Sequence, residues 1–452
     1  MSRVHVRFGS GAEIGNSHHG FRFPPDPNYI GVDFGLQPRE PGAGYDSQEL
    51  SHGRLSEFTI PHLVADIMPH HFITHSHLDH TGALPLLYKI YRARHGAEPN
   101  FMLYMSEIAL ETTERLLWEP TIRMADQDER PRPFDYGDIA GVRSRVRVVR
   151  SGEVLDFEHF RAVAFDAGHV PGAFYWIFIP KNGADPVFTS GDISFRDLGI
   201  VKPAAPIPDQ FGRFSVAVME ATYLGKVIPD RKAEMARLRT HAREVLARRG
   251  TLVVPVFSIG SRGLEVGTDF AKHNIGPVYY DGMLKDAIRL YKDLGVAPAG
   301  FSEKNFVRGK SHMEELIRRH EPKVVIAAGG MMPEGSRAWL YAGDAIGHYE
   351  DGVAIVGFQG PGTPGECLVK SADRGMVQFG SRRIRRGCTV EQFQLSAHAD
   401  NPEIEALLAR LNPGTVIFNH GEPENIDEYI ARNTGKVPWK MTRASLNAEL
   451  IF

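Results

Sequence analysis

The sequence predicts an α/β fold, and three observations indicate it. Short apolar runs of strand length recur along the chain, and many of them end in a glycine or a polar residue. Segments with the apolar spacing of helices lie between some of these runs, an alternation typical of α/β proteins. The chain has 452 residues, 42% of them hydrophobic, so it can bury a large core and is long enough for two domains or one domain with a large insertion.

The expected elements begin with a strand at the N-terminus. Residues 4–8 alternate apolar and polar and are followed by glycine, which is typical of a strand and not of a signal peptide. The later strand-like runs are FITHS, AVAFDAGH, PVFTSGD, SVAVME, TLVVPVFS, KVVIAAGG, GVAIVGF and TVIFNHGE. We expect helices from about residue 81 (TGALPLLYKIYRA), over 231–249 and over 402–411, the last with Asn401 as its N-cap.

Two changes in character mark candidate domain boundaries. A proline-rich stretch, KPAAPIPDQFG, covers residues 202–212, and the composition changes again near Gly387, after the basic run RRIRR. No internal repeat or low-complexity segment stands out.

Composition excludes several classes of protein. Lys plus Arg total 52 against 55 Asp plus Glu, so the net charge of −3 gives no global signal for nucleic acid, and any site for a polyanion must be a local patch. The two cysteines, Cys367 and Cys388, are too few for a disulfide framework and fit a reducing compartment. Apolar runs stay far below the roughly 18 residues that span a bilayer, so we expect a cytoplasmic protein without a membrane partner.

The segment THSHLDHTG carries the strongest chemical signal. His75 and His77 are two residues apart, a spacing that directs both imidazoles the same way from an extended segment but not from a helix. Asp79 and His80 follow, so four ligand-type side chains would lie on a loop between a strand and a helix. Imidazole nitrogen and carboxylate oxygen suit zinc and similar divalent metals. A surface cluster of histidines is the alternative interpretation.

A metal site on this loop needs further ligands from other strand ends, because one short loop cannot supply a complete set for two metals. Candidates are present in the expected places. His169 follows AVAFDAG, Asp192 follows PVFTSG and His420 follows TVIFN. Alone, each has an ordinary structural explanation, as a turn-forming aspartate or a buried core histidine. Together with His75 to His80 they predict a metal centre.

These motifs resemble the β-CASP branch of the metallo-β-lactamase superfamily, the nuclease group that includes RNase J and the endonuclease subunit of the mRNA 3′-end cleavage factor. The HxHxDH pattern is shared by the whole superfamily. The segments MEATYLG at Met219, LSAHAD at Leu395 and NHGE at Asn419 make the resemblance specific to the β-CASP branch. Matching segments run along nearly the whole chain.

The resemblance implies a four-layered αββα metallo-β-lactamase domain with an inserted α/β β-CASP domain. The first part of the metallo-β-lactamase domain would cover residues 1–214 and its C-terminal part residues 388–452. The inserted domain would cover residues 215–387.

The resemblance also implies roles for individual residues. One zinc would be held by His75, His77 and His169, and a second by Asp79, His80 and His420, with Asp192 bridging the two. Asp33 matches the acidic residue of the family's first motif and would orient the metal-bound groups. Glu220 and His398 match the acidic and histidine positions beside the scissile phosphate.

The implied activity is hydrolysis of RNA phosphodiester bonds by a hydroxide activated between two zinc ions, with His398 as general acid. Single-stranded RNA would be the substrate, because the RNA-cleaving members carry histidine at the position of His420 whereas DNA-repair members carry an aliphatic residue. The alternatives are a DNA nuclease of the same family, a hydrolase of thioesters or lactams, and a scaffold that has lost catalysis. The sequence is compatible with a homodimer and identifies no protein partner.

The run RRIRR at residues 382–386 is the densest basic segment of the chain. It has two interpretations, a solvated strand face or a contact to the phosphates of the substrate.

Overall fold

The structure is a computed structural model that describes residues 3–38, 58–96, 99–127, 129, 131–297, 301–319 and 321–452. The chain divides into two compact units. The first unit comprises Met1–Asp197, Lys202–Val227 and Ala397–Phe452, so both ends of the chain contribute to it. The second unit comprises Leu198–Val201 and Ile228–Ser396.

Two seven-stranded sheets form the centre of the first unit. The order of one sheet is β23 (Glu449–Ile451), β1 (His5–Phe8), β2 (His19–Arg22), β3 (Ile30–Val32), β6 (His70–Phe72), β7 (Met102–Met105) and β8 (Val146–Val148). The order of the other is β22 (Lys440–Arg443), β21 (Thr415–Asn419), β13 (Val216–Glu220), β12 (Val187–Thr189), β11 (Phe174–Pro180), β10 (Phe160–Asp166) and β9 (Val154–Asp156). A short pair, β4 (Gln37–Pro38) and β5 (Phe58–Thr59), lies outside them.

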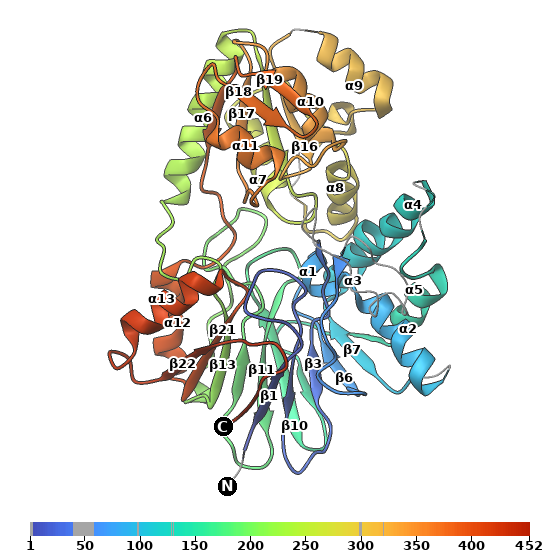
Figure 1. Cartoon of the computed structure of the whole chain (residues 1–452), viewed down its shortest axis with the longest axis vertical. Helices are drawn as coiled ribbons and strands as arrows, with labels where there is room; N and C mark the ends of the chain where they lie inside the picture. The colour runs from blue at the N-terminus through green and yellow to red at the C-terminus, as the bar shows by residue number, and fades with distance from the viewer. Residues whose placement is uncertain are drawn as a thin grey trace. The chain divides into compact units, whose positions relative to one another are not determined.

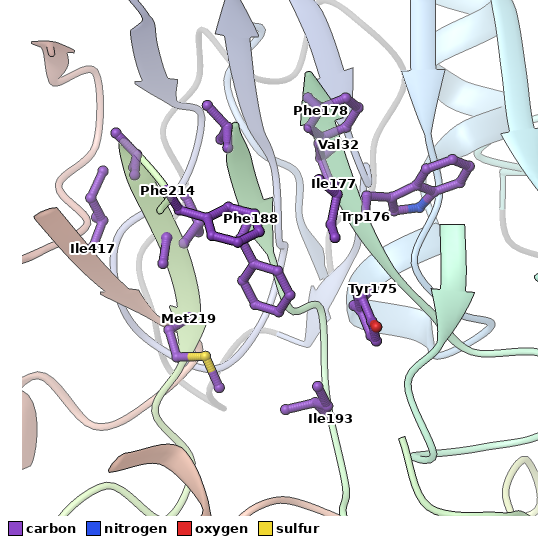
Figure 2. Close-up of a cluster of buried hydrophobic side chains, with 14 of the residues drawn as sticks. Val32, Tyr175, Trp176, Ile177, Phe178, Phe188, Ile193, Phe214, Met219 and Ile417 are labelled. Atoms are coloured by element: carbon purple, nitrogen blue, oxygen red, sulfur yellow. The ribbon is translucent and has the colours of Figure 1, made fainter. Parts of the chain in front are cut away.

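Aromatic side chains fill the space between the two sheets. Phe72 of β6 lies 5.0 Å from Trp176 and 4.9 Å from Phe178, both on β11, measured between ring centroids. These contacts join one sheet to the other, and edge-to-face packing of this kind adds to the gain from burying the rings. Figure 2 shows part of the cluster, including Trp176, Phe178 and Phe188.

Helices cover the outer faces of the two sheets. Figure 1 shows α2 (Leu84–His95), α3 (Glu107–Thr113), α4 (Glu119–Gln127) and α5 (Tyr136–Arg143) on one side, and α12 (Asn401–Leu411) and α13 (Pro423–Asn433) on the other. Leu84 and Leu87 of α2 pack in one buried cluster with Leu103 of β7. The first unit is therefore an αββα sandwich, which confirms the expected fold class.

The strands that precede the candidate ligands end at common edges of the sheets. β3, β6 and β7 are mutually parallel, and so are β12, β13 and β21. β10 runs in the same direction as β12, because each is antiparallel to β11. Loops that leave the carboxyl ends of such strands converge, which is where open α/β sheets place binding sites.

The second unit is built on a five-stranded parallel sheet. Its order is β15 (Val278–Asp281), β16 (Lys323–Ala328), β14 (Thr251–Val256), β17 (Gly352–Ile355) and β20 (Thr389–Gln392). Its helices are α6 (Arg231–Ala247), α7 (Arg262–Lys272), α8 (Leu284–Asp293), α9 (Gly309–Arg318), α10 (Arg337–Ala345) and α11 (Pro364–Lys370). A separate antiparallel hairpin joins β18 (Met376–Phe379) to β19 (Arg382–Arg385).

The strand and helix predictions are confirmed, with three corrections. The strand expected in FITHS lies earlier, because β6 covers His70–Phe72 and shares only Phe72 with that run. The N-cap of α12 is Asp400 and not Asn401: the Asp400 side chain accepts a hydrogen bond from the Glu403 amide, and the Glu403 side chain accepts one from the Asp400 amide. The helix expected from residue 81 begins earlier, with the single turn α1 (Leu78–Thr81). Amides of His80 and Thr81 donate to the His77 carbonyl, which closes this turn.

The boundaries of the units differ from the expected residues 215 and 387. β13 begins at Val216 yet pairs with β12 and β21, so the first unit continues to Val227. β20 pairs with β17, so the second unit continues to Ser396. Strand pairing, and not the change in composition, sets both limits.

Among the described residues, none of the helices combines the length and apolar character that a membrane span requires.

Candidate metal centre

The histidine-rich segment is held from both sides of the sandwich. It follows β6, and the Ile73 amide donates to the Tyr104 carbonyl in the neighbouring strand. The Trp176 indole of the facing sheet donates to the Ile73 carbonyl at 3.1 Å. His75 and His77 precede α1, with His77 in extended conformation at its N-cap, whereas Asp79 and His80 lie on α1. The expectation that all four lie on a loop is thus correct only for the first two.

The first candidate ligand set is His75, His77, His169 and Asp192, whose ligand atoms all lie within 4.8 Å of one another. His77 Nδ1 is 3.1 Å from His75 Nε2 and 3.2 Å from His169 Nε2. Asp192 Oδ2 is 3.4 Å from His75 Nε2 and 3.5 Å from His169 Nε2. Zinc bonds of about 2.0–2.1 Å in a tetrahedron separate neighbouring ligands by about 3.3–3.4 Å, so the four atoms fit one zinc ion.

The second candidate set is Asp79, His80 and His420, also within 4.8 Å of one another. His420 Nε2 is 3.1 Å from Asp79 Oδ2, and His80 Nε2 is 4.0 Å from the same oxygen. This set is less regular than the first. His420 also presents Nδ1 to Asp192 Oδ1 at 3.3 Å, so either ring nitrogen can serve as the ligand.

Asp192 lies between the two sets. Its Oδ2 faces His75 and His169, while its Oδ1 is 3.5 Å from His80 Nε2. Asp192 Oδ1 and His80 Nε2 are both buried, and neither has a hydrogen-bond partner among the described residues. Buried polar atoms are normally satisfied, so two orphaned ligand atoms facing each other fit a shared cation.

Asp33 holds His80 in one orientation. Its Oδ1 accepts from the Thr74 amide at 2.8 Å, and its Oδ2 accepts from the Thr74 hydroxyl at 2.7 Å and from His80 Nδ1 at 2.8 Å. Donation from Nδ1 leaves Nε2 as the ligand atom, which is how carboxylates commonly orient metal-binding histidines. Asp33 and His420 both have positive φ, 53° and 52°, a strained conformation that the surrounding contacts must maintain.

Burial and charge give the histidines different protonation. Burial, together with the nearby His80, lowers the pKa of His75 to about 3, and burial also lowers the pKa of His77 and His169. These imidazoles are therefore neutral, as metal ligands must be. Burial opposes the charge on His80, but the carboxylates of Asp192, Asp79 and Asp33 outweigh it and raise the pKa of His80 to about 10. The surroundings of His80 thus favour positive charge.

The buried Glu220 and the partly buried His398 form a pair beside the first ligand set. His398 Nδ1 is 2.8 Å from Glu220 Oε2, and the ring centroids of His398 and His169 are 4.5 Å apart. The Glu220 carboxylate also accepts from the Ile193 amide at 2.7 Å and from the Thr222 hydroxyl at 2.7 Å. Its oxygens are thus committed to hydrogen bonds, so Glu220 suits the positioning of His398 better than metal binding.

His398 is fixed by the chain around it. The Ala399 amide donates to the Ile193 carbonyl at 2.7 Å, and Asp400 accepts from Arg196 at 2.7 Å. Burial acts to lower the pKa of His398, but the charge and hydrogen bond of Glu220 outweigh it and raise that pKa. The structure thus brings together the candidate residues of the sequence, including Asp33, Glu220 and His398.

Sequence reasoning missed several groups that orient the site. Thr74 contacts Asp33, His75 and His80, and the Ala397 carbonyl lies 2.8 Å from His169 Nδ1. Thr222 contacts both Glu220 and His420. Thr74 lies inside the FITHS run and Thr222 inside MEATY, so their positions within these motifs were the available signal. The contact of the Ala397 carbonyl cannot be read from the sequence, because every residue has a backbone carbonyl.

The αββα fold and the buried His/Asp centre define a metal-dependent hydrolase. Three family descriptions match the chain in order: "Metallo-beta-lactamase superfamily" over residues 72–217, "Beta-Casp domain" over 267–368 and "Zn-dependent metallo-hydrolase RNA specificity domain" over 383–441. The chain belongs to the β-CASP branch of the metallo-β-lactamase superfamily, a group of hydrolytic nucleases.

Several archaeal proteins are similar to this chain along most of its length. "Probable RNase MJ4" of Methanocaldococcus jannaschii is 23% identical over 80% of this chain and 83% of its own. "RNase aCSPSF2" of Saccharolobus solfataricus is 26% identical over 78% and 69%. "Transcription termination factor FttA" of Pyrococcus abyssi is 26% identical over 88% of this chain, which spans only 64% of that factor.

A solved structure of a protein of unknown function from Enterococcus faecalis is similar in fold. It is 14% identical, covers 100% of both chains and has a TM-score of 0.58. At this identity the likeness concerns the fold alone.

Proposed function

We propose that this protein is a zinc-dependent ribonuclease that hydrolyses phosphodiester bonds in single-stranded RNA. The observation that carries the proposal is the Glu220–His398 pair beside the candidate ligands, with His398 Nδ1 2.8 Å from Glu220 Oε2. The departing ribose oxygen needs a proton, and an imidazole held in position can supply it. The description of residues 383–441 as an RNA specificity domain and the relatives named as RNases support RNA as the substrate.

The residues that would hold the metals follow from the two ligand sets. His75, His77 and His169 would bind one zinc, and Asp79, His80 and His420 a second, with one oxygen of Asp192 directed to each set. When bound, such a pair lowers the pKa of water towards about 7 and withdraws charge from phosphate oxygens.

The chain's own residues position the reacting groups. Asp33 fixes the ring of His80, and the Ala397 carbonyl fixes the ring of His169 through Nδ1. Glu220 favours the protonated form of His398, since it raises the pKa of that imidazole against the effect of burial. His398 then donates its proton to the departing oxygen of the RNA, and Glu220 keeps the ring in place during the transfer.

The direct test uses purified protein, end-labelled RNA and a gel. We expect cleavage that a chelator abolishes and that added zinc restores, with close to two zinc ions per chain by elemental analysis. Products of intermediate length would identify internal cuts, and mononucleotides would identify an exonuclease. A protein that retains both zinc ions and cuts no RNA would contradict the proposal.

A further inference from the structure

The side chains of the basic run RRIRR point to two faces, because Arg382–Arg385 form strand β19. β19 pairs antiparallel with β18, and the register places Arg383 opposite Gln378 and Arg385 opposite Met376. Ile384 is opposite Val377 and Arg382 is opposite Phe379. Directly opposed residues share a face, and successive residues alternate between faces. Val377 and Phe379 are buried, so Arg382 and Ile384 belong to the inward face.

The arginines on the inward side and at the end of the hairpin have structural partners. The Arg382 guanidinium lies over the Trp339 ring at 4.4 Å, and that ring is stacked on Phe379 with centroids 6.0 Å apart. Arg386, just after β19, donates to the Ser371 carbonyl at 2.6 Å and to the Cys388 carbonyl at 3.3 Å. These two arginines hold the hairpin against the rest of the second unit.

Arg383 and Arg385 are different. Both are exposed, and neither forms an ion pair with any of the described residues. Their cross-strand neighbours, Gln378 and Met376, are exposed and carry no charge. Two carboxylates contact other residues of this region, since Asp373 lies 3.7 Å from Arg386 and Glu334 accepts from the Ser381 amide. Residues two apart on a strand have Cα atoms about 6.6 Å apart, so both side chains leave neighbouring positions on the same face.

We propose that Arg383 and Arg385 bind the phosphate backbone of the RNA strand. The chain as a whole carries a charge of −3, so attraction of a polyanion depends on local patches such as this one. Arginine matches phosphate with two parallel hydrogen bonds, and contacts of this kind add affinity without reading sequence. The inference rests on the proposed ribonuclease function and identifies a substrate contact on the second unit, whereas the candidate metal ligands belong to the first unit.

Binding of a short, unstructured, fluorescent RNA tests the proposal by anisotropy over a series of salt concentrations. The Arg383→Ala/Arg385→Ala variant is compared with its parent in a His398→Ala background, so that the RNA stays intact. Each lost phosphate contact lowers the slope of log affinity against log salt by about 0.7, so we expect a decrease of about 1.4 and roughly tenfold weaker binding at about 0.1 M salt. Single-stranded DNA should lose affinity by the same factor.

The matched control is Arg161→Ala/Arg243→Ala, which removes two exposed arginines that also form no ion pair with described residues. It should bind RNA like its parent. If both double variants change affinity equally, the effect is one of total charge, and the specific contact is refuted. Unchanged binding by the Arg383/Arg385 variant would also overturn the proposal. An acidic protein would then be the alternative ligand of the hairpin.

A second readout separates this inference from the proposed function. With His398 intact, the Arg383→Ala/Arg385→Ala variant should hydrolyse a dinucleotide at the parental rate. The one phosphodiester of a dinucleotide is the bond that is cleaved, so no further phosphate can bind the hairpin. A slower dinucleotide reaction would place these arginines in catalysis and contradict the proposal. If the parent cuts no RNA at all, the ribonuclease proposal fails, while the anisotropy experiment still reports whether the hairpin binds RNA.

Discussion

His398 is the residue whose replacement best separates catalysis from metal binding. Its ring lies beside His169, and its Nδ1 contacts Glu220 at 2.8 Å. We expect His398→Ala to lose about 10²- to 10⁴-fold in cleavage rate, as for a missing general acid, while zinc stays bound. Single-turnover cleavage and elemental analysis measure the two effects. A variant that purifies without metal would identify His398 as a ligand instead.

Glu220 determines how cleavage should depend on pH. A general acid acts in its protonated form, so the rate persists below the pKa of His398 and falls as pH rises through it. Glu220 raises that pKa against the effect of burial. In Glu220→Gln the raising charge is gone, the pKa of His398 falls, and the alkaline limb of the pH–rate profile should move to lower pH. An alkaline limb that stays in place would show that another group is the acid.

Asp192 is the residue on which both metals should depend. One of its oxygens faces His75 and His169, and the other faces His80. We expect Asp192→Ala to lose both zinc ions and nearly all hydrolysis, because the shared ligand is removed. Elemental analysis and a cleavage assay measure this. Normal zinc content with normal activity would disprove the two-metal arrangement.

At the scale of elements, the start of α12 connects helix capping to catalysis. Asp400 caps this helix, accepts from Arg196 at 2.7 Å and lies two residues after His398. Asp400→Ala should cost about 1 kcal/mol in unfolding free energy. It should also slow cleavage by up to about 100-fold at unchanged zinc content, since His398 loses its anchor.

The control for this prediction is Asp135→Ala. Asp135 forms a second capping box with Asp138 at the start of α5, on the opposite side of the sandwich. The two variants should lose similar stability in thermal or denaturant unfolding, but only Asp400→Ala should lose activity. Equal losses of activity would mean that the effect of Asp400 is one of general stability.

The elements were predictable where a local pattern determines them. The buried strands contain short apolar runs, such as VIF within TVIFN, and β21 covers these five residues. Asn401 and Asp400 are both good N-caps, and only the reciprocal bond with Glu403 decides between them. The turn α1 was missed because it has four residues, too few for a helical period to be visible.

The candidate site was likewise predictable only where a local pattern determines it. Residues at strand ends, such as His169 and Asp192, could be proposed because a strand directs its last side chain to the edge of the sheet. Asp33, Glu220 and His398 rested on family resemblance alone. Their contacts depend on pairings between distant segments, such as Thr74 with Asp33 and Ile193 with Glu220, which no local pattern contains.

At the scale of the molecule, the first unit requires both ends of the chain. β1 at the N-terminus pairs with β23 at the C-terminus, with His5 opposite Ile451. The candidate ligands extend from His75 to His420, and the second unit is inserted between their strands. The second ligand set therefore requires the C-terminal segment, because His420 follows β21, which pairs with β13.

The last prediction concerns the choice between RNA and DNA. His420 leaves the end of β21, and its Nε2 lies 3.1 Å from Asp79 and its Nδ1 3.3 Å from Asp192, so it can complete the second ligand set, which an aliphatic residue at this position cannot do. The family description of residues 383–441 as an RNA specificity domain supports the same choice. Contacts to phosphate cannot distinguish the two nucleic acids, so discrimination requires contacts to the 2′-hydroxyl. We expect faster cleavage of single-stranded RNA than of DNA of the same sequence, measured side by side at matched salt because ionic strength alone changes such affinities greatly. Equal or faster cleavage of the DNA strand would assign this protein to the DNA-processing members of its family.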